Sequence, residues 1–274
     1  MGTLYLVATP IGNLEDMSPR AVRVLQEVSL IAAEDTRHTG KLLNHFQIET
    51  PITSYFEHNK LNKLDFILEK LSTGDVALVS DAGMPAVNDP GYELVNAALA
   101  SNHDVKPVPG PSAPITALTV SGLPTDSFLY LGYLPNKTSE RHKRLEEVEG
   151  QPYTLVFLES PYRIVESLED IFLILGDRKI CVAREMTKMF EEYWRGNVSG
   201  AVQYFKSQAP RGEFTLVIDG KKMDGSQKWT EEQLQMAIEN ELKNEKSAKD
   251  ISVELAKQSG WNKKEIYTLI NQNK

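Results

Sequence analysis

Short hydrophobic runs rich in β-branched residues alternate with helical patterns from Leu4 to Val108. The runs occupy residues 4–8, 28–34, 76–81 and 105–108, and apolar residues at helical spacing lie between them. Runs of this length and composition are typical of buried strands. The alternation predicts a parallel α/β domain.

Two helix starts carry their own local signals. Ser18 precedes Pro19, which is the order expected of an N-cap followed by the first helical residue. A second helix is expected near residue 92, directly after the turn residues Asp89, Pro90 and Gly91. These signals fix where the helices begin in the alternating pattern.

The pattern resets around residues 132–140, which are polar and contain Gly and Pro. Further strands are predicted within 153–160, 179–185 and 213–220, with a helix within 162–175. We therefore predict an α/β fold of two domains, one over residues 1–132 and a smaller one over 133–222.

The composition changes again near Lys221, and three helical patterns follow without a strand. Thr230 with Gln233 fits a capping box, and Ser247 with Asp250 fits its acidic form. A turn at 259–261 separates the last two helices at a spacing that resembles a helix-turn-helix. Residues 223–274 are thus predicted to form a helical appendage, which either contacts nucleic acid or serves packing or dimer contact.

Composition and charge argue against several classes of protein. The 274 residues carry a net charge of −8, which argues against broad non-specific binding to nucleic acid and leaves only local basic patches for a polyanion. No apolar run is long enough to span a bilayer, and the N-terminus has no basic region of a signal peptide. The single cysteine, Cys181, lies in a predicted buried strand. A cytoplasmic protein without a membrane contact is expected.

The turn after the first strand, residues 9–12, lies where α/β sheets bind nucleotides. It lacks the three glycines of a dinucleotide fingerprint, because Thr9, Pro10 and Ile11 fill those spacings. No Gly-Lys-Ser/Thr sequence follows this turn or the similar one at 80–91. The sequence therefore predicts a ligand without a polyphosphate.

Two further loops end at the same expected sheet edge. The loop after residue 79 carries Ser80, Asp81 and Gly83, and the loop within 107–118 carries the small residues Ser112 and Ala113. Asp81 is placed either to accept hydrogen bonds from a ribose or an amine, or to cap a helix. Three such loops at one edge favour a ligand site, with room against a flat ring.

Groups able to move a proton or hold a hydroxyl occur in two stretches. Asp35 and Arg37 follow the second predicted strand, and His58 and Asn59 lie within residues 54–60. A solvated helix start and an ordinary loop are the alternative interpretations. The chain has no cysteine cluster or closely spaced histidine pair and no Gly-x-Ser-x-Gly turn, which argues against a built-in zinc site and against serine hydrolysis.

The densest basic run of this acidic chain lies beside the predicted domain boundary. It contains Lys137, Arg141, Lys143 and Arg144. Basic runs on helices are usually solvated faces, but this position beside an interdomain cleft also suits contacts with RNA phosphates. Both interpretations stay open.

Five stretches together resemble a known family. Residues 4–21, 33–43, 80–95, 109–124 and 181–188 resemble, in order and spacing, the ribosomal RNA small subunit methyltransferase I family of the tetrapyrrole-methylase superfamily. The resemblance covers about residues 3–219. It implies two α/β domains with S-adenosylmethionine in the cleft between them, no metal, a homodimer, and 2'-O-methylation of a cytidine ribose in small-subunit ribosomal RNA.

The resemblance also implies roles for individual residues. The implied donor-binding residues are Pro10, Ile11, Ser80, Asp81, Gly83, Met84, Ser112, Ala113, Leu158, Glu159, Met186 and Thr215. His58 and Asp35 are the candidates for a base, with Arg37 and Asn59 orienting ribose or phosphate. The alternatives are tetrapyrrole or diphthine methylation by the same pocket, or a ribosome-binding protein that does not catalyse. The basic run favours RNA as the acceptor.

Overall fold

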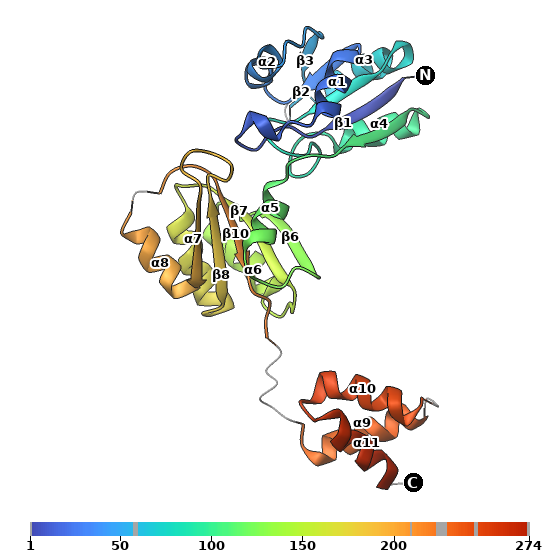
Figure 1. The fold of residues 1–274 in the computed structure, drawn as a ribbon, viewed down its shortest axis with the longest axis vertical. Coiled ribbons are helices and arrows are strands. Elements are labelled where there is room, and N and C mark those ends of the chain that lie inside the picture. The colour runs from blue at the N-terminus through green and yellow to red at the C-terminus, as the bar shows by residue number, and fades with distance from the viewer. Residues whose placement is uncertain (1, 57–59, 209, 223–228, 244–245, 273–274) are drawn as a thin grey trace. The chain divides into compact units, whose positions relative to one another are not determined.

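The structure is a computed structural model that describes residues 2–56, 60–208, 210–222, 229–243 and 246–272. The chain divides into two compact units, Met1–Gly220 and Lys221–Lys274. The first unit contains two five-stranded sheets, and the described part of the second contains helices alone (Figure 1). The predicted α/β fold with a helical appendage is confirmed, while the residue limits of the three predicted domains stay a prediction.

All strands of the first sheet run parallel in the order β3-β2-β4-β1-β5. Their bounds are Thr3–Val7 for β1, Leu30–Ala33 for β2, Ile52–Ser54 for β3, Val76–Val79 for β4 and Asp104–Val108 for β5. The four predicted strands are confirmed. The edge strand β3 was missed because its three half-buried residues are too few to show a period.

Helices cover both faces of this sheet. Helices α1 (Pro19–Glu27) and α2 (Thr36–His45) pack on one face, and α3 (Lys60–Thr73) and α4 (Tyr92–Ala100) pack on the other. Successive strand residues alternate between the two cores, as Leu30 and Ile31 do. Because the strands are parallel and doubly covered, the loops that follow them all lie at one edge of the sheet.

The predicted helix starts are confirmed. The Ser18 hydroxyl accepts a hydrogen bond of 3.1 Å from the backbone N–H of Ala21, and a 3₁₀ turn over Leu14–Asp16 precedes it. At the start of α4, Gly91 has a φ of 152°, and a Cβ there would lie 2.8 Å from the Cβ of Ala86. Only glycine fits this position.

The second sheet has the order β6-β7-β10-β8-β9 and is mixed. Its strands are β6 (Phe128–Tyr133), β7 (Thr154–Glu159), β8 (Lys179–Arg184), β9 (Glu192–Asn197) and β10 (Phe214–Ile218). Only the β6–β7 pair is parallel. The predicted β7, β8 and β10 are confirmed. The edge strands β6 and β9 were missed. The end of β6 overlaps the polar segment 132–140 with its Gly and Pro, and β9 is polar and half exposed.

One face of the second sheet is covered by α6 (Thr138–Val148), α7 (Ile164–Leu175) and α8 (Val198–Lys206). The other face packs on α5 (Ala113–Val120) and on Ile11, which comes from the turn after β1. Cys181 is fully buried in the core between this second face and α5, as predicted. We call residues 2–112 the first lobe and residues 113–220 the second lobe.

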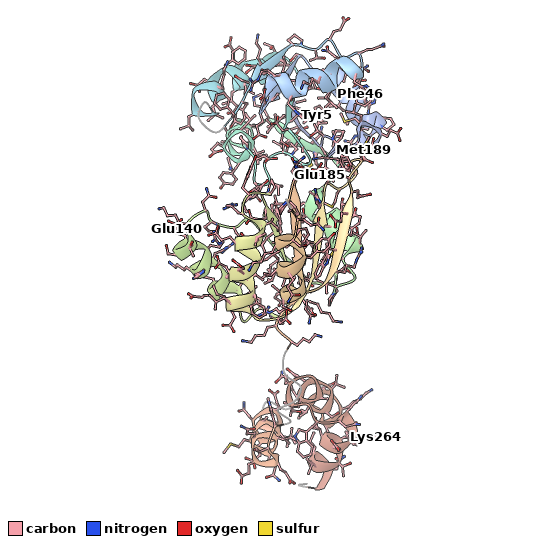
Figure 2. All side chains as sticks on the ribbon, turned by 90° about the vertical axis from the view of Figure 1, so that its left-hand side faces the viewer. Tyr5, Phe46, Glu140, Glu185, Met189 and Lys264 are labelled. Atoms are coloured by element: carbon pink, nitrogen blue, oxygen red, sulfur yellow. The ribbon has the colours of Figure 1, made fainter. Side chains whose placement is uncertain are left out.

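The lobes approach each other closely at two glycines. A Cβ at Gly12 would lie 2.6 Å from Cγ of Lys188 and 2.9 Å from the carbonyl oxygen of Met186. Figure 2 shows Glu185 and Met189, of the same loop, at the end of the second lobe that faces the first. Gly132 in β6 has a φ of +67°, and a Cβ there would overlap the side-chain amide of Asn88.

The helical unit consists of α9 (Glu231–Lys243), α10 (Ala248–Ser259) and α11 (Lys263–Gln272), packed around buried Leu234, Ile251 and Ile266. The capping box is confirmed, since the Thr230 N–H donates to Oε1 of Gln233 over 3.0 Å and the Gln233 N–H donates to the Thr230 hydroxyl over 3.2 Å. Hydrogen bonds also join Ser247 and Asp250. Gly260 takes the left-handed conformation that ends α10.

No helix within the described ranges is both long and apolar enough to cross a membrane.

Gly132→Ala is expected to lower the free energy of unfolding of the chain by about 1–3 kcal/mol, because a left-handed non-glycine residue is strained and the new methyl group displaces Asn88. Urea unfolding measures the change. Gly150→Ala is the matched control, because a Cβ at Gly150 meets no atom within 4 Å. Equal stability of the two variants would contradict a tight contact between Gly132 and Asn88.

Candidate functional site

A cavity of about 610 Å³ lies between the lobes of the first unit, at the edge where the strands of the first sheet end. Both lobes contribute to its wall. The lining residues are Ile11, Glu34, Asp81–Asp89 without Pro85 and Ala86, Pro109, Gly110, Ser112–Ile115, Phe128, Tyr130, Tyr133, Leu158, Met186 and Glu213–Thr215. Its volume is within the range of sites for drug-sized ligands.

Backbone hydrogen bonds tie two of the three predicted loops together. The Thr9 N–H donates to the Gly83 carbonyl over 2.9 Å, and the Gly83 N–H donates to the Thr9 carbonyl over 3.0 Å. The Thr9 hydroxyl donates to the Ser80 carbonyl over 3.1 Å. The third loop joins at Gly110, where a Cβ would lie 2.9 Å from the Cβ of Ala8. The first wall of the cavity is thus one connected unit.

Three carboxyl groups line this wall, from Glu34, Asp81 and Asp89. Asp81 follows β4, and its Oδ1 accepts the backbone N–H of Asp35 over 3.2 Å. The backbone N–H of Asp81 donates to Oε2 of Glu34 over 3.3 Å. Asp81 thus links the ends of two neighbouring strands and does not cap the helix that follows it.

The environment of Asp89 and Glu34 favours their neutral forms. The pKa of Asp89 is raised to about 6, mainly by burial and then by the charge of Glu34. The charge of Asp81 makes a smaller contribution to this rise, and the nearby Ser80 hydroxyl opposes it. Burial also raises the pKa of Glu34. A positively charged ligand would relieve this repulsion.

The opposite wall is mainly apolar and aromatic. Strand β6 contributes Phe128, Tyr130 and Tyr133, and loops of the second lobe contribute Leu158 and Met186. Burial, with a smaller contribution from the charge of Asp89, raises the pKa of Tyr130 to about 12. Asp89 therefore lies close enough to the β6 wall for its charge to act on it.

A β-bulge brings both tyrosines to the cavity. Residues three apart point to opposite faces of a regular strand. The register of β6 against β7 shifts between Tyr130 and Tyr133, where left-handed Gly132 is located. The extra residue turns Tyr133 to the same side as Tyr130.

Most of the predicted donor-binding residues line the cavity. These are Ile11, Asp81, Gly83, Met84, Ser112, Ala113, Leu158, Met186 and Thr215. Pro10, Ser80 and Glu159 are buried and do not line it.

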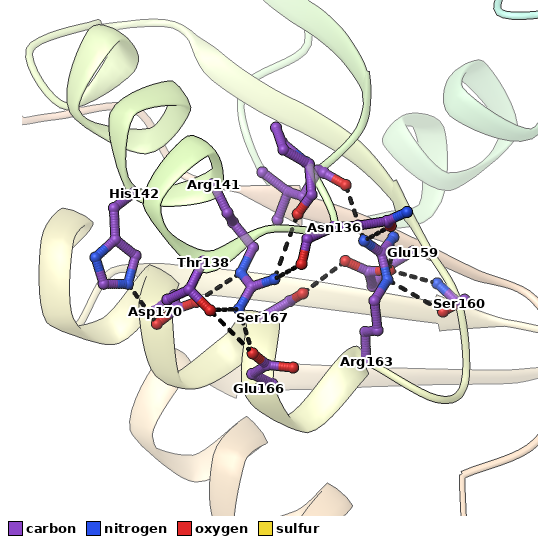
Figure 3. Close-up of polar contacts among 12 residues, drawn as sticks. Asn136, Thr138, Arg141, His142, Glu159, Ser160, Arg163, Glu166, Ser167 and Asp170 are labelled. Atoms are coloured by element: carbon purple, nitrogen blue, oxygen red, sulfur yellow. Dashed lines mark hydrogen bonds and ion pairs between the residues drawn. The ribbon is translucent and has the colours of Figure 1, made fainter.

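Glu159 is held inside the second lobe. Its carboxylate accepts hydrogen bonds from the Ser160 N–H over 2.7 Å, Arg163 over 2.6 Å and the Ser167 hydroxyl over 2.6 Å (Figure 3). These donors occupy both carboxylate oxygens. Its position at the end of β7 makes it a support for the neighbouring Leu158, which does line the cavity.

Of the predicted base candidates, Asp35 caps α2. Its carboxylate accepts the backbone N–H of Arg37 over 2.8 Å and pairs with the Arg37 guanidinium over 2.8 Å. These hydrogen bonds hold the pKa of Asp35 well below its usual range, so it is a weak proton acceptor. His58 and Asn59 lie outside the described residues.

The prediction that Arg141 contacts RNA needs correction. Its side chain is fully buried, with Nε 2.5 Å from Asp170 and Nη2 2.6 Å from Glu166 (Figure 3). Nη1 donates to the carbonyl oxygens of Pro135 and Asn136. A guanidinium held in this way is not available to a phosphate, and it fixes the loop between β6 and α6 instead.

The other residues of the basic run are at the surface. Lys137 pairs with Glu140 over 3.0 Å, and Arg144 pairs with Glu147 over 3.1 Å. Lys143 is exposed. Their contact with RNA stays a prediction.

Sequence reasoning missed several cavity residues. Asp89 was interpreted only as part of a helix start. Glu34 was interpreted as a group able to move a proton or as part of a solvated helix start, and it was not assigned to the donor site. Tyr130 and Tyr133 lie in a strand that was not predicted. The Asp-Pro-Gly turn was a usable signal for Asp89, since it follows a strand end and precedes a helix. Among the described residues, no group of three or more His, Cys, Asp or Glu side chains is arranged to hold a metal ion.

The two lobes and the cavity between them define a class of methyltransferase. Residues 3–201 match the family described as Tetrapyrrole (Corrin/Porphyrin) Methylases, to which the chain belongs. Among solved structures, diphthine synthase is similar at a TM-score of 0.63 and 12% identity, over 81% of this chain and 90% of that one. Uroporphyrin-III-C-methyltransferase from Thermus thermophilus is similar at a TM-score of 0.56 and 19% identity, over 79% of this chain and 94% of that one. At these identities the likeness shows the fold.

Relatives in sequence show to which family within these methylases the chain belongs. A protein named ribosomal RNA small subunit methyltransferase I from Halalkalibacterium halodurans is 45% identical over 99% of this chain and 95% of its own length. A protein of the same name from Synechocystis is 45% identical over 98% of this chain and 97% of its own length. The chain thus belongs to the ribosomal RNA small subunit methyltransferase I family, as the sequence motifs indicated.

A third relative is informative about the helical unit. The protein of the same name from Thermotoga maritima is 46% identical over 223 residues, which are 100% of that protein and 81% of this chain. The aligned length is close to that of the first unit, Met1–Gly220. That relative is thus about as long as the two-lobed unit alone.

Arg141→Met is expected to cost about 3–5 kcal/mol of stability, because it removes the arginine from the buried carboxylate of Asp170 and leaves His142 as its remaining partner. Chemical denaturation measures this loss. The control is Arg144→Met, which removes a partly exposed pair with Glu147 and is expected to cost less than about 1 kcal/mol. A similar small loss in both variants would contradict the structural role of Arg141.

Proposed function

We propose that this methyltransferase transfers the methyl group of S-adenosylmethionine to the 2'-oxygen of a cytidine ribose in 16S ribosomal RNA of the small subunit. The observation that carries the proposal is the cavity with its connected loops and its acidic wall, in a chain of this family. Small-subunit ribosomal RNA is the acceptor that the relatives' name indicates.

The cavity suits the chemistry of this donor. The molecule has a sulfonium, an ammonium and a ribose but no phosphate, and the lining has carboxylates and no lysine, arginine or histidine among the described residues. Gly110, Ser112 and Ala113 leave space for a flat ring, and Leu158 and Met186 supply apolar contacts. Asp81 is the proposed acceptor of hydrogen bonds from the ribose or the ammonium group.

The chain's own contribution to the reaction is mainly positioning. Methyl transfer needs the attacking oxygen in line with the methyl carbon and the sulfur, and a fixed geometry supplies several kcal/mol of the rate enhancement. The paired loops at Thr9 and Gly83 give such a rigid wall. No step of this proposal involves a metal.

Contacts with RNA must come from local groups, because the chain is acidic overall. Lys137, Lys143 and Arg144 on α6 are proposed to contact phosphates. Arg37, with 89% of its side chain exposed, is proposed to orient the acceptor together with Asn59. A cytoplasmic homodimer is the proposed working form.

Tetrapyrrole methylation is the competing activity, favoured by the fold of the solved relatives. A porphyrinogen substrate carries many carboxylates, which the acids Glu34, Asp81 and Asp89 would repel. The deciding experiment supplies radiolabelled S-adenosylmethionine with naked RNA, assembled small subunits or a porphyrinogen. Label is expected in RNA, at a ribose 2'-oxygen of a cytidine, and label in the porphyrinogen alone would overturn the proposal.

Asp81→Ala is expected to weaken S-adenosylmethionine binding by about 1–3 kcal/mol, because a half-buried hydrogen-bond acceptor is removed from the wall of the cavity. Calorimetry in the presence of a chelator measures the affinity. Asp104→Ala serves as the control, since Asp104 begins β5 at the opposite end of the sheet and 70% of its side chain is exposed. Equal affinities of the two variants would remove Asp81 from the donor site.

A chain ending at Gly220 is expected to fold and to bind S-adenosylmethionine like the full chain, because the division between the compact units falls there and all strands are retained. If the helical unit helps to engage RNA, the truncation raises KM for the RNA substrate and changes kcat less. Steady-state methylation kinetics distinguish the two effects. An unchanged KM would remove the helical unit from RNA engagement.

A further inference from the structure

The loop that carries Asp89 has an unusual backbone. Ala86 and Asn88 have φ values of 66° and 64°, in the left-handed region that residues with a Cβ rarely adopt. Such strain persists only where the surroundings enforce it, and it is concentrated at functional sites. The side chain of Asn88 packs against Gly132 of β6. Asp89 is the next residue of this loop.

Asp89 lies between the two walls of the cavity. From the first lobe it faces Glu34 at the end of β2, and Ser80 and Asp81 at the end of β4. From β6 it faces Tyr130 and Tyr133, whose ionisation its charge opposes. No lysine, arginine or histidine is among the described residues that line the cavity, so no cation of the chain neutralises this group there.

The neighbouring acids already accept hydrogen bonds from other groups of the chain. Glu34 accepts the backbone N–H of Asp81, and Asp81 accepts the backbone N–H of Asp35. Asp35 itself is held by Arg37, which makes its carboxylate weakly basic. Asp89 lies near the Ser80 hydroxyl, and its pKa of about 6 is close to the range in which a base works best at neutral pH.

We propose that the Asp89 carboxylate accepts the proton of the ribose 2'-hydroxyl during methyl transfer. In this step the O–H bond breaks and its proton moves to Asp89, while a lone pair of the oxygen forms the new O–C bond. The bond between methyl carbon and sulfur breaks with its electron pair going to sulfur. A cation and a carboxylate become a thioether and a carboxylic acid, so charge and atoms balance.

The charge of the donor couples these events. Before transfer, the sulfonium stabilises ionised Asp89, which keeps it ready to accept a proton. Transfer removes the positive charge, and the repulsion from Glu34 and Asp81 then favours protonated Asp89. The acidic wall thus promotes proton uptake at the moment when the hydroxyl loses its proton. This assignment rests on the proposed function, because it needs the sulfonium donor and a hydroxyl acceptor.

The first test compares Asp89→Asn with the control Asp104→Asn, which makes the same chemical change at an exposed side chain at the far end of the sheet. The amide introduced at position 89 keeps the shape of the carboxylate but accepts no proton. We expect kcat on the RNA substrate to fall by about 100-fold or more at saturating donor and RNA, which is the usual contribution of a general base. The control is expected to keep the unmodified rate.

The second test is the pH dependence. In the unmodified chain, kcat should fall with decreasing pH below an apparent pKa at or under about 6, because protonated Asp89 accepts no proton and the bound donor lowers its pKa from the free value. Asp89→Asn should lack this acid limb. A kcat of the unmodified chain that stays constant from about pH 7.5 down to about pH 4, the ordinary range of a carboxyl group, would overturn the proposal whether or not the variant folds well.

The third test needs no turnover. Calorimetry should show that the affinity for S-adenosylmethionine falls as the pH drops through about 6, since protonation of Asp89 removes a negative charge beside the sulfonium. The neutral thioether S-adenosylhomocysteine should show a weaker dependence, and Asp89→Asn should lose the difference. The same pH dependence of S-adenosylmethionine affinity in the unmodified chain and in Asp89→Asn would overturn the proposal, because Asp89 would then not lie beside the sulfonium.

The outcomes separate this assignment from the proposed function. Methylation of RNA by the unmodified chain, with Asp89→Asn equally fast, overturns the role of Asp89 alone. A loss in Asp89→Asn that saturating donor restores also overturns it, because Asp89 would then only bind the donor. If the unmodified chain transfers no methyl group to RNA, the proposed function fails and the assignment fails with it.

Discussion

The backbone pairing of Thr9 with Gly83 is the contact on which the site depends. Two N–H···O=C bonds join the turn after β1 to the loop after β4, and Gly83 allows the left-handed φ that this pairing needs. Because β1 and β4 are adjacent parallel strands, their loops emerge at the same edge. The pairing makes them a rigid wall, so that Asp81 and Ile11 have fixed positions.

Electrostatic repulsion at this wall is the second organising feature. Glu34, Asp81 and Asp89 would lower their free energy by separating, but the parallel strands and the contact of Asn88 with Gly132 hold them together. A site that maintains such repulsion is suited to a cationic ligand and to a proton. In the second lobe, by contrast, the acids Glu159, Glu166 and Asp170 are paired with arginines and serve the fold.

Much of the fold and part of the site could be predicted from the sequence. The strands with strong apolar runs and the helices with clear caps were predicted, because period and capping are local properties. The loops with Asp81, Gly83 and Ser112 were found for the same reason. Edge strands β3 and β9 were missed, since short or polar strands depend on their neighbours for stability. Arg141 was misassigned because its sequence position does not reveal that Asp170 and Glu166 enclose it.

The sequence by itself determined the alternation of strands and helices, the loops at one sheet edge and the family motifs, since all of these are encoded in contiguous residues. Only the tertiary structure decided which side chains share the cavity. The bulge at Gly132 turns Tyr130 and Tyr133 to one side, and the contact of Gly132 with Asn88 places Asp89 opposite them. Such a juxtaposition joins residues that are distant along the chain, and it depends on packing and on the burial of charge, which no local pattern specifies.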